Sequence, residues 1–353
     1  MQYKRSRLKL IIFLLLLFIC IGIFIFNIEV NTNKNSSLKV EGRKHDLLIG
    51  TAVNGEALNN DAEYKKKIRE EFSIITPENE MKFSVVQPNL NKFNFKNADK
   101  IVEFAEENEI KVRGHTLVWD KRIPDWLENS NFTKEEAEQI LKNHIYTVVN
   151  RYKGRVYAWD VVNEAFNNDG SLKDSYWLRT IGPEYIKKAF IWAKEADPDA
   201  LLFYNDYSAE VTNEKSNAIF NLLKSFKNEK IPVDGIGFQF HTNLYQKFTE
   251  NEITINMERF RDIGLKINVT ELDVKISDSN YSEKLKLKKQ AEQYSVVLNS
   301  CMNLKGSCTV FSMWGFTDKY TWIRSDSPLL LNSVYEKKPS YNAIKNILTN
   351  IHQ

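Results

Sequence analysis

The chain has 353 residues, of which 42% are apolar and 12% aromatic, enough for a packed core in one large domain or two ordinary ones. Its 49 Lys and Arg residues nearly balance 46 Asp and Glu residues, so the net charge is only +3. Because both signs are mixed along the chain, no nucleic-acid partner is expected. Cys, His and acidic residues show no metal-ligand spacing, so we expect neither a metal nor a cofactor.

The first residues have the charged-then-apolar order of an export signal. Four cationic residues between positions 4 and 9 precede an uninterrupted apolar run over residues 10–26. No small-x-small cleavage site follows this run, which is longer than an ordinary signal core, so an uncleaved membrane anchor is favoured over a cleaved signal peptide. Residues 1–28 are therefore predicted to export the protein, which is either secreted or tethered to the cell surface by residues 10–26.

Residues 29–44 are polar and rich in Asn and Ser, which is typical of a flexible tether. Beyond them, short apolar runs alternate with amphipathic stretches as far as residue 353, and we interpret residues 45–353 as one catalytic domain. Strands are predicted at residues 47–53, 72–76, 110–114, 156–162, 200–204, 234–238, 265–270 and 308–313. Helices are predicted from the end of the first strand to residue 71 and at residues 97–108, 133–152, 183–196, 212–229, 253–263, 282–303 and 340–348.

Eight strand-helix units over this length favour the α/β fold class and a (β/α)₈ TIM barrel. An open doubly wound sheet is the alternative, but no Gly-x-Gly-x-x-Gly motif follows any strand. The helix at residues 133–152 should begin with a capping box, because Thr133 is followed three residues later by Glu136.

Two short apolar strands each deliver a glutamate at their end. Glu164 closes the run Trp159 to Val162 after Asn163, and Glu271 closes the run that starts at Leu265. A carboxylic acid at the end of a buried strand has a rigid support and lies half out of water, which suits proton transfer. Two such groups meeting at one face of a sheet form the pair that glycoside hydrolysis requires.

The remaining unusual polar and aromatic residues also follow predicted strands. Barrel enzymes build their active sites at the C-terminal ends of their strands, so this placement supports the barrel and predicts where its site lies. These residues are Glu78, Asn79, Lys82, His115, Trp119, Asn163, Asn205, Gln239, His241, Asp273, Trp314 and Trp322.

With these residues in view, the sequence resembles the endo-β-1,4-xylanases of glycoside hydrolase family 10 from about residue 45 to residue 350. The resemblance implies retaining hydrolysis of internal β-1,4-xylosidic bonds in xylan and xylo-oligosaccharides, through a covalent glycosyl-enzyme intermediate. It also implies that Glu164 is the acid/base and Glu271 the nucleophile. The motifs that carry it lie at residues 76–82, 114–119, 159–166, 205–207, 237–241, 270–273 and 314–322.

The resemblance assigns further roles. His241 and Asp273 would support the nucleophile, Asn163 and Asn205 would donate hydrogen bonds, and Gln239 would lie beside the acid/base. Sugars before the scissile bond would be held by Glu78, Asn79, Lys82 and His115. Trp119, Trp314 and Trp322 would provide apolar faces for sugar rings, and Tyr207 would contact the sugar beyond the scissile bond.

Retaining enzymes hold their two carboxyl groups about 5–5.5 Å apart. At that gap two negative charges repel by roughly 3 kcal/mol at an effective dielectric constant of about 20. We therefore expect Glu164 to keep its proton while Glu271 is charged, and to lose it more easily once Glu271 has formed an ester with the sugar.

The chain departs from the family pattern after Trp119. Asp120-Lys121-Arg122 stands where relatives commonly have His-Ser-Gln, which puts the distal donor-side subsite in question. Cys301 and Cys308 are close enough in sequence to form a disulfide in an exported protein, with two buried free thiols as the alternative. No repeat or linker indicates a second domain, and we expect a monomer.

Other functions remain open from the sequence. A related barrel could cleave cellulose or a mixed-linkage glucan, depending on the room near Trp314 and Trp322. A glycan-binding barrel without catalysis should carry a lesion at Glu164, Glu271 or their support, and none is present. A structural membrane scaffold gives no reason for polar residues at the strand ends.

Overall fold

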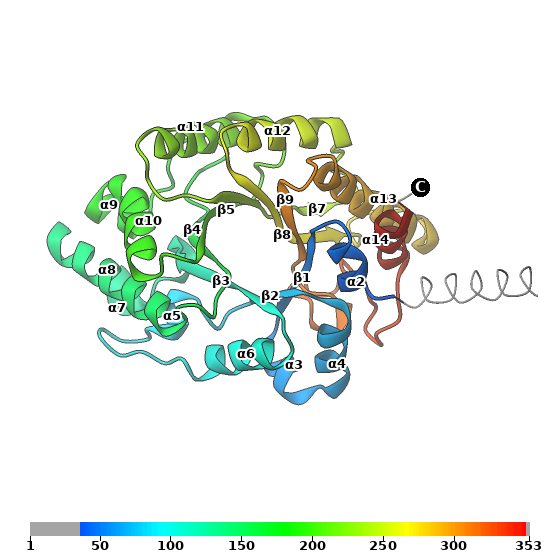
Figure 1. Cartoon of the computed structure of the whole chain (residues 1–353), viewed down its shortest axis with the longest axis horizontal. Helices are drawn as coiled ribbons and strands as arrows, with labels where there is room; N and C mark the ends of the chain where they lie inside the picture. Colours follow the sequence, from blue (N-terminus) through cyan, green and yellow to red (C-terminus); the bar gives the residue numbers. More distant parts are fainter. Residues whose placement is uncertain (1–35, 351–353) are drawn as a thin grey trace, which may run out of the picture.

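A closed barrel of parallel strands with helices around its outside forms the protein (Figure 1). The computed structural model describes residues 36–350. Within them β1 to β6 pair in chain order, β9 pairs with β1 and β8 with β9, and the pairing of β6 with β8 closes the ring. The predicted barrel is confirmed. Its strands are β1 (Leu48–Val53), β2 (Ile74–Pro77), β3 (Lys111–Val118), β4 (Ala158–Asn163), β5 (Leu201–Asp206), β6 (Gly235–Phe238), β8 (Lys266–Lys275) and β9 (Cys308–Met313).

The short strand β7 (His241–Asn243) is not part of the ring and was not expected from the sequence. It pairs with the far end of β8, so that His241 lies opposite Asp273. This pairing is possible because β8 is ten residues long and continues past the barrel. The extension places one polar pair of the predicted site in register.

Helices connect the strands on the outside of the barrel, as parallel pairing requires. The barrel strands are buried along almost their whole length, since they contact side chains inside the ring and helices outside it. The helices are α2 (Leu38–Arg43), α3 (Gly55–Asn60), α4 (Ala62–Glu71), α5 (Phe83–Val86), α6 (Lys96–Glu107), α7 (Asp125–Glu128), α8 (Lys134–Arg151), α9 (Tyr176–Ile181), α10 (Glu184–Ala196), α11 (Glu214–Asn228), α12 (Glu250–Asp262), α13 (Glu283–Met302) and α14 (Pro339–Asn350), with the 3₁₀ turns η1 (Asp120–Arg122) and η2 (Asp318–Tyr320).

The predicted capping box is present at the start of α8. The Glu136 backbone N–H donates to Thr133 Oγ1 at 3.3 Å, and the Thr133 backbone N–H donates to Glu136 Oε2 at 2.8 Å. A second capping box, between Thr249 and Glu252, begins α12. Each box pairs backbone donors that have no partner within their own helix, so both helix starts are fixed by local sequence.

The tether predicted for residues 29–44 is wrong over its last part. Residues 38–43 form helix α2, which contacts α14 near the end of the chain (Figure 1). Leu38 is fully buried, and its backbone N–H donates to Glu71 Oε2 at 2.9 Å. Since Leu38 and Val40 are the only two apolar side chains of this helix, no helical periodicity reveals it, and its formation depends on tertiary contacts.

The predicted anchor over residues 1–28 and the first part of the tether lie outside the described residues. Among residues 36–350, no helix combines the length and apolar character that crossing a bilayer requires.

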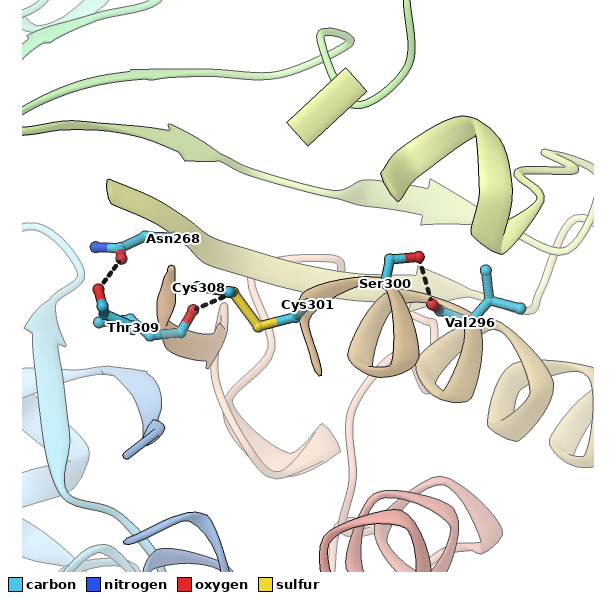
Figure 2. Close-up of a disulfide and its surroundings, with 7 residues drawn as sticks. Asn268, Val296, Ser300, Cys301, Cys308 and Thr309 are labelled. Atoms are coloured by element: carbon cyan, nitrogen blue, oxygen red, sulfur yellow. Dashed lines mark hydrogen bonds between the residues drawn. A yellow bond between two sulfur atoms is a disulfide. The ribbon is translucent and has the colours of Figure 1, made fainter. Parts of the chain in front are cut away.

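A disulfide joins Cys301, in the last turn of α13, to Cys308, at the start of β9 (Figure 2). The bond resolves the two alternatives that the sequence left for these cysteines in favour of a bridge. Both residues are buried, and the loop between them is short. The bridge fixes the return of the chain from the outer helix layer into the last barrel strand.

Helix α2 can be tested as part of the folded domain with two substitutions in one turn. Leu38→Ala should lower the free energy of unfolding by about 2–3 kcal/mol, since it removes a fully buried side chain. Val40→Ala is the matched control, because Val40 is 43% exposed, and it should change stability by less than about 0.5 kcal/mol. Urea unfolding measures the free energy of unfolding of both variants. A loss in Leu38→Ala as small as that in Val40→Ala would show that α2 does not belong to the domain.

Candidate active site

A cleft of about 440 Å³ opens at the C-terminal ends of the barrel strands. Side chains from the ends of β2, β3, β4, β5, β6, β8 and β9 meet there, because barrel closure brings these ends into one ring. A smaller pocket, lined in part by Asp120, Lys173 and Tyr185, borders the same wall behind Glu164, so both belong to one site. The lining residues of the cleft are Glu78, Asn79, Lys82, His115, Trp119, Lys121, Arg122, Asn163, Glu164, Tyr207, Gln239, His241, Glu271, Trp314 and Trp322.

The two predicted catalytic glutamates lie on this same wall and are joined by amide side chains. Asn205, on β5, donates from Nδ2 to Glu271 Oε1 at 2.7 Å and to Asn163 Oδ1 at 2.8 Å. Asn163 Nδ2 in turn lies 3.4 Å from Glu164 Oε1. Asn205 is fully buried, so it acts from behind the cleft as a rigid link between the two acidic side chains.

The backbone of Glu164 has φ +58°, in the left-handed region that non-glycine residues rarely adopt. Two hydrogen bonds hold this turn: the Glu164 N–H donates to the Asn205 carbonyl at 2.9 Å, and the Ala165 N–H donates to Tyr204 Oη at 2.9 Å. The conformation turns the Glu164 side chain out of the strand direction. Backbone geometry of this kind is often kept where a side chain must point into a site.

The carboxylate of Glu164 is surrounded by donors. Lys121 Nζ lies 3.0 Å and Lys173 Nζ 3.4 Å from Glu164 Oε2, while Gln239 Nε2 donates to Oε1 at 3.3 Å. Burial by itself raises the pKa of Glu164, but the two ammonium groups outweigh burial and hold its pKa below the ordinary value.

This direction differs from the expectation that Glu164 keeps its proton beside a charged Glu271. The expectation considered repulsion between the two carboxylates and omitted the two lysines. Lys173 lies in the loop before α9, and no motif distinguishes it in the sequence.

His241 joins the second glutamate to Asp273. Its Nε2 lies 3.1 Å from Glu271 Oε2 and its Nδ1 lies 2.8 Å from Asp273 Oδ2. Burial alone lowers the pKa of His241, but the carboxylates of Asp273 and Glu271 outweigh burial and raise the pKa well above the ordinary value. This direction favours the protonated imidazole, which lies between the carboxyl groups of Glu271 and Asp273. The indole N–H of Trp322 also donates to Asp273 Oδ2, at 2.8 Å.

The far end of the cleft combines charge with aromatic faces. Lys82 Nζ contacts Asn79 Oδ1 at 3.0 Å and lies 5.1 Å from the centre of a Trp119 ring. Burial lowers the pKa of Lys82 to about 8 and raises the pKa of Glu78. Trp314 is buried, whereas Trp322 is 51% exposed, so one tryptophan forms a wall and the other a projecting edge.

Arg113 and Asp160 form a buried layer below the cleft that the sequence analysis did not identify. Arg113 Nε donates to Asp160 Oδ2 at 3.2 Å, and His115 Nδ1 lies 3.0 Å from the same oxygen. Asp160 faces the opposite side of β4 from its neighbours Trp159 and Val161, and its contacts with Arg113 and His115 place its side chain inside the barrel. A charged residue at an inward position of a central strand is the signal that could have identified it.

Tyr207 lies at the opposite side of the cleft, among lysines. Lys215 Nζ, fully buried, lies 3.7 Å from its ring centre and pairs with Asp206 Oδ1 at 2.6 Å. Lys121 and Lys173 lie 5.5 and 5.0 Å from the same centre. The structure thus brings every predicted site residue to the cleft wall or directly behind it. Asn205 and Asp273 are the two that lie behind the wall.

The model of the family described as Glycosyl hydrolase family 10 matches residues 37–347. The chain belongs to this family. The family 10 domain is 42% identical over 318 residues to Endo-1,4-beta-xylanase B of Thermotoga neapolitana, covering 88% of this chain and 91% of that protein.

Solved structures agree with this membership. Xylanase 10B from Thermotoga petrophila, in complex with xylobiose, is 45% identical, with a TM-score of 0.85 over 89% of this chain and 97% of that one. Native xylanase 10B from Thermotoga maritima is 46% identical, with a TM-score of 0.85 over 88% of this chain and 98% of that one. The matched region starts at residue 37, which agrees with helix α2 being part of the family 10 domain.

The charge on His241 can be measured by ¹⁵N NMR of its ring. Asp273→Asn should lower the pKa of His241, because it removes the negative charge that most strongly favours the protonated ring. Trp322→Phe is the control, since it removes one hydrogen bond to Asp273 and keeps the carboxylate. His144 serves as an internal reference, because burial lowers its pKa to about 3. An unchanged His241 titration in Asp273→Asn would contradict the assignment.

Proposed function

We propose that this chain is an endo-1,4-β-xylanase that hydrolyses internal xylosidic bonds with retention of anomeric configuration. The observation that carries the proposal is that Glu164 and Glu271 face one sugar-sized cleft and are linked through the Asn163 and Asn205 amides. Two neighbouring carboxyl groups with different partners are the requirement for double displacement. The three similar proteins compared above are named xylanases, which supports the substrate.

In the first half of the reaction Glu271 acts as nucleophile. One carboxylate oxygen forms a bond to the anomeric carbon while the bond from that carbon to the leaving oxygen breaks. The proton of Glu164 moves to the leaving oxygen, so the acceptor part of the glycan departs as an alcohol. The ring of His241 orients the nucleophile through the contact of its Nε2 with Glu271 Oε2.

In the second half Glu164 acts as base. It takes a proton from water as the water oxygen attacks the anomeric carbon, and the ester bond to Glu271 breaks. Glu164 then carries the proton needed for the next cycle. The flanking lysines of Glu164 favour its charged form, which is the form that this second half requires.

Eight of the other lining residues recognise the glycan. Asn79, Lys82, Glu78 and His115 provide hydrogen bonds to sugars before the scissile bond, and Tyr207 contacts the sugar after it. Flat pyranose rings pack against Trp119, Trp314 and Trp322, which offer apolar faces beside these polar groups.

Reducing-sugar release decides between xylan and a glucan. We expect release from unsubstituted xylan at least about 100-fold faster than from cellulose or mixed-linkage glucan, because a hexose adds a hydroxymethyl group where Trp314 and Trp322 close the cleft. Glu271→Gln is the matched background control for both substrates. Equal or faster release from cellulose would overturn the substrate assignment.

The stereochemical course can be followed independently by ¹H NMR of the first products. Double displacement should release the β-anomer, which then mutarotates to the equilibrium mixture. Glu271→Ala should lower kcat by at least about 10³-fold, since it removes the nucleophile. Initial appearance of the α-anomer would show that a water attacks directly and that Glu271 is not a nucleophile.

We also propose that residues 10–26 tether the enzyme to the outer face of a membrane. The apolar run and the cationic residues before it support this location. The full chain should appear in the membrane fraction with its first residues intact, whereas deletion of residues 1–28 should leave the activity in the soluble fraction. N-terminal sequencing of mature protein that starts after residue 28 would contradict the anchor.

A further inference from the structure

One of the two lysines that flank Glu164 lies at the rim of the cleft. Lys121 belongs to the short turn η1, and its side chain is 54% exposed, yet its Nζ lies 3.0 Å from Glu164 Oε2. The side chain of Glu164 is only 7% exposed. Lys121 therefore reaches from the rim of the cleft to the most important proton donor of the reaction.

Several other charged and polar groups face Glu164. Lys173 Nζ approaches the same oxygen at 3.4 Å from a side chain that is 12% exposed. Gln239 and Asn163 donate to the other oxygen, at 3.3 and 3.4 Å. Asp120 and the buried Asp206 are acidic groups near Glu164 and act against the lysines. The pKa values of both aspartates are raised, mainly by burial, and the charge on Glu164 raises them further. Lys121 and Lys173 are thus the cations that compensate Glu164.

We propose that Lys121 sets the upper pH limit of the enzyme by holding Glu164 in its carboxylate form, and that it acts through Glu164 without binding the reacting sugar. It is a positioning residue of the acid/base. The inference rests on the proposed role of Glu164 as acid and base.

The direction of the effect follows from the two half-reactions. Transfer of the Glu164 proton to the leaving oxygen needs the protonated carboxyl group, and an ammonium group beside it disfavours that form. Proton abstraction from water needs the carboxylate, which the same ammonium group favours. Lys121 therefore slows the first half at neutral and basic pH and assists the second half.

Lys121 is a better site than Lys173 for testing this effect by substitution. Lys173 is largely buried beside Tyr207, so its removal leaves a gap as well as a missing charge. Lys121 projects from the surface of η1, and removing its charge disturbs little packing. Its neighbour Arg122 is also exposed and lines the same cleft. In the described part of the chain, Arg122 is not among the groups that act on Glu164, so it provides a matched control.

The experiment compares pH profiles of kcat/KM on soluble xylan for the full chain and three variants: Lys121→Met, Lys121→Arg and Arg122→Met. The basic limb of kcat/KM reports loss of the proton from Glu164 in the free enzyme. In Lys121→Met this limb should move up by on the order of one pH unit, the size expected for one half-exposed charge at this distance. In Lys121→Arg and Arg122→Met it should move by less than about a third of that.

A second substrate separates proton control from sugar binding. A xylobioside with a dinitrophenolate leaving group departs without a proton, so its rate does not depend on protonated Glu164 in the first half. For this substrate kcat/KM of Lys121→Met should stay within about twofold of the wild-type value across the same pH range. A loss as large as that on xylan would show that Lys121 binds the sugar, and would overturn the proposal.

The remaining outcomes are equally decisive. An unmoved basic limb in Lys121→Met overturns the proposal, as does an equal shift in Lys121→Arg, which keeps the charge. A wild-type chain that releases no sugar from xylan contradicts the proposed function itself, whereas an active wild-type chain with an unshifted variant contradicts only the role of Lys121.

Discussion

Closure of the parallel barrel is the constraint on which the site depends. The strands that carry Glu164 and Glu271 are not neighbours, since β5 and β6 lie between β4 and β8 in the ring. The side chain of Asn205, from β5, spans this interval and contacts both sides. Because the pairing of β6 with β8 fixes the circumference, the separation of the two acids is set by backbone hydrogen bonds rather than by flexible loops.

The barrel also carries charge in its interior, and each buried charge has partners. Beneath the cleft, Asp160 accepts a hydrogen bond from Arg113 and contacts His115. Beside the cleft, Asp206 forms an ion pair with Lys215 and accepts a hydrogen bond from the hydroxyl of Tyr204. Such groups would be costly if one member were missing, so these networks fix side-chain positions more than they add stability. The Tyr204 hydroxyl also accepts the Ala165 N–H, which connects a buried ion pair to the unusual backbone of the acid/base.

Sequence reasoning located the strands and their polar ends, because both depend on local patterns. Short apolar runs that end on Glu164 and Glu271 require no tertiary information to be recognised. Helix α2 could not be predicted in the same way, since Leu38 becomes buried only through contact with distant parts of the chain. The same limit applies to Lys121, whose contact with Glu164 joins residues 43 positions apart, so its effect on proton affinity becomes visible only in three dimensions.

The hydrogen bond from the Trp322 indole to Asp273 connects the projecting aromatic ring to the residues that support the nucleophile. Asp273 Oδ2 accepts from both this indole and His241. A glycan that displaces the Trp322 ring would weaken one of these two bonds and leave the carboxylate more available to the imidazole. Occupancy of a sugar-stacking surface would thereby change, through a single shared oxygen atom, the hydrogen bond that orients the histidine beside the nucleophile.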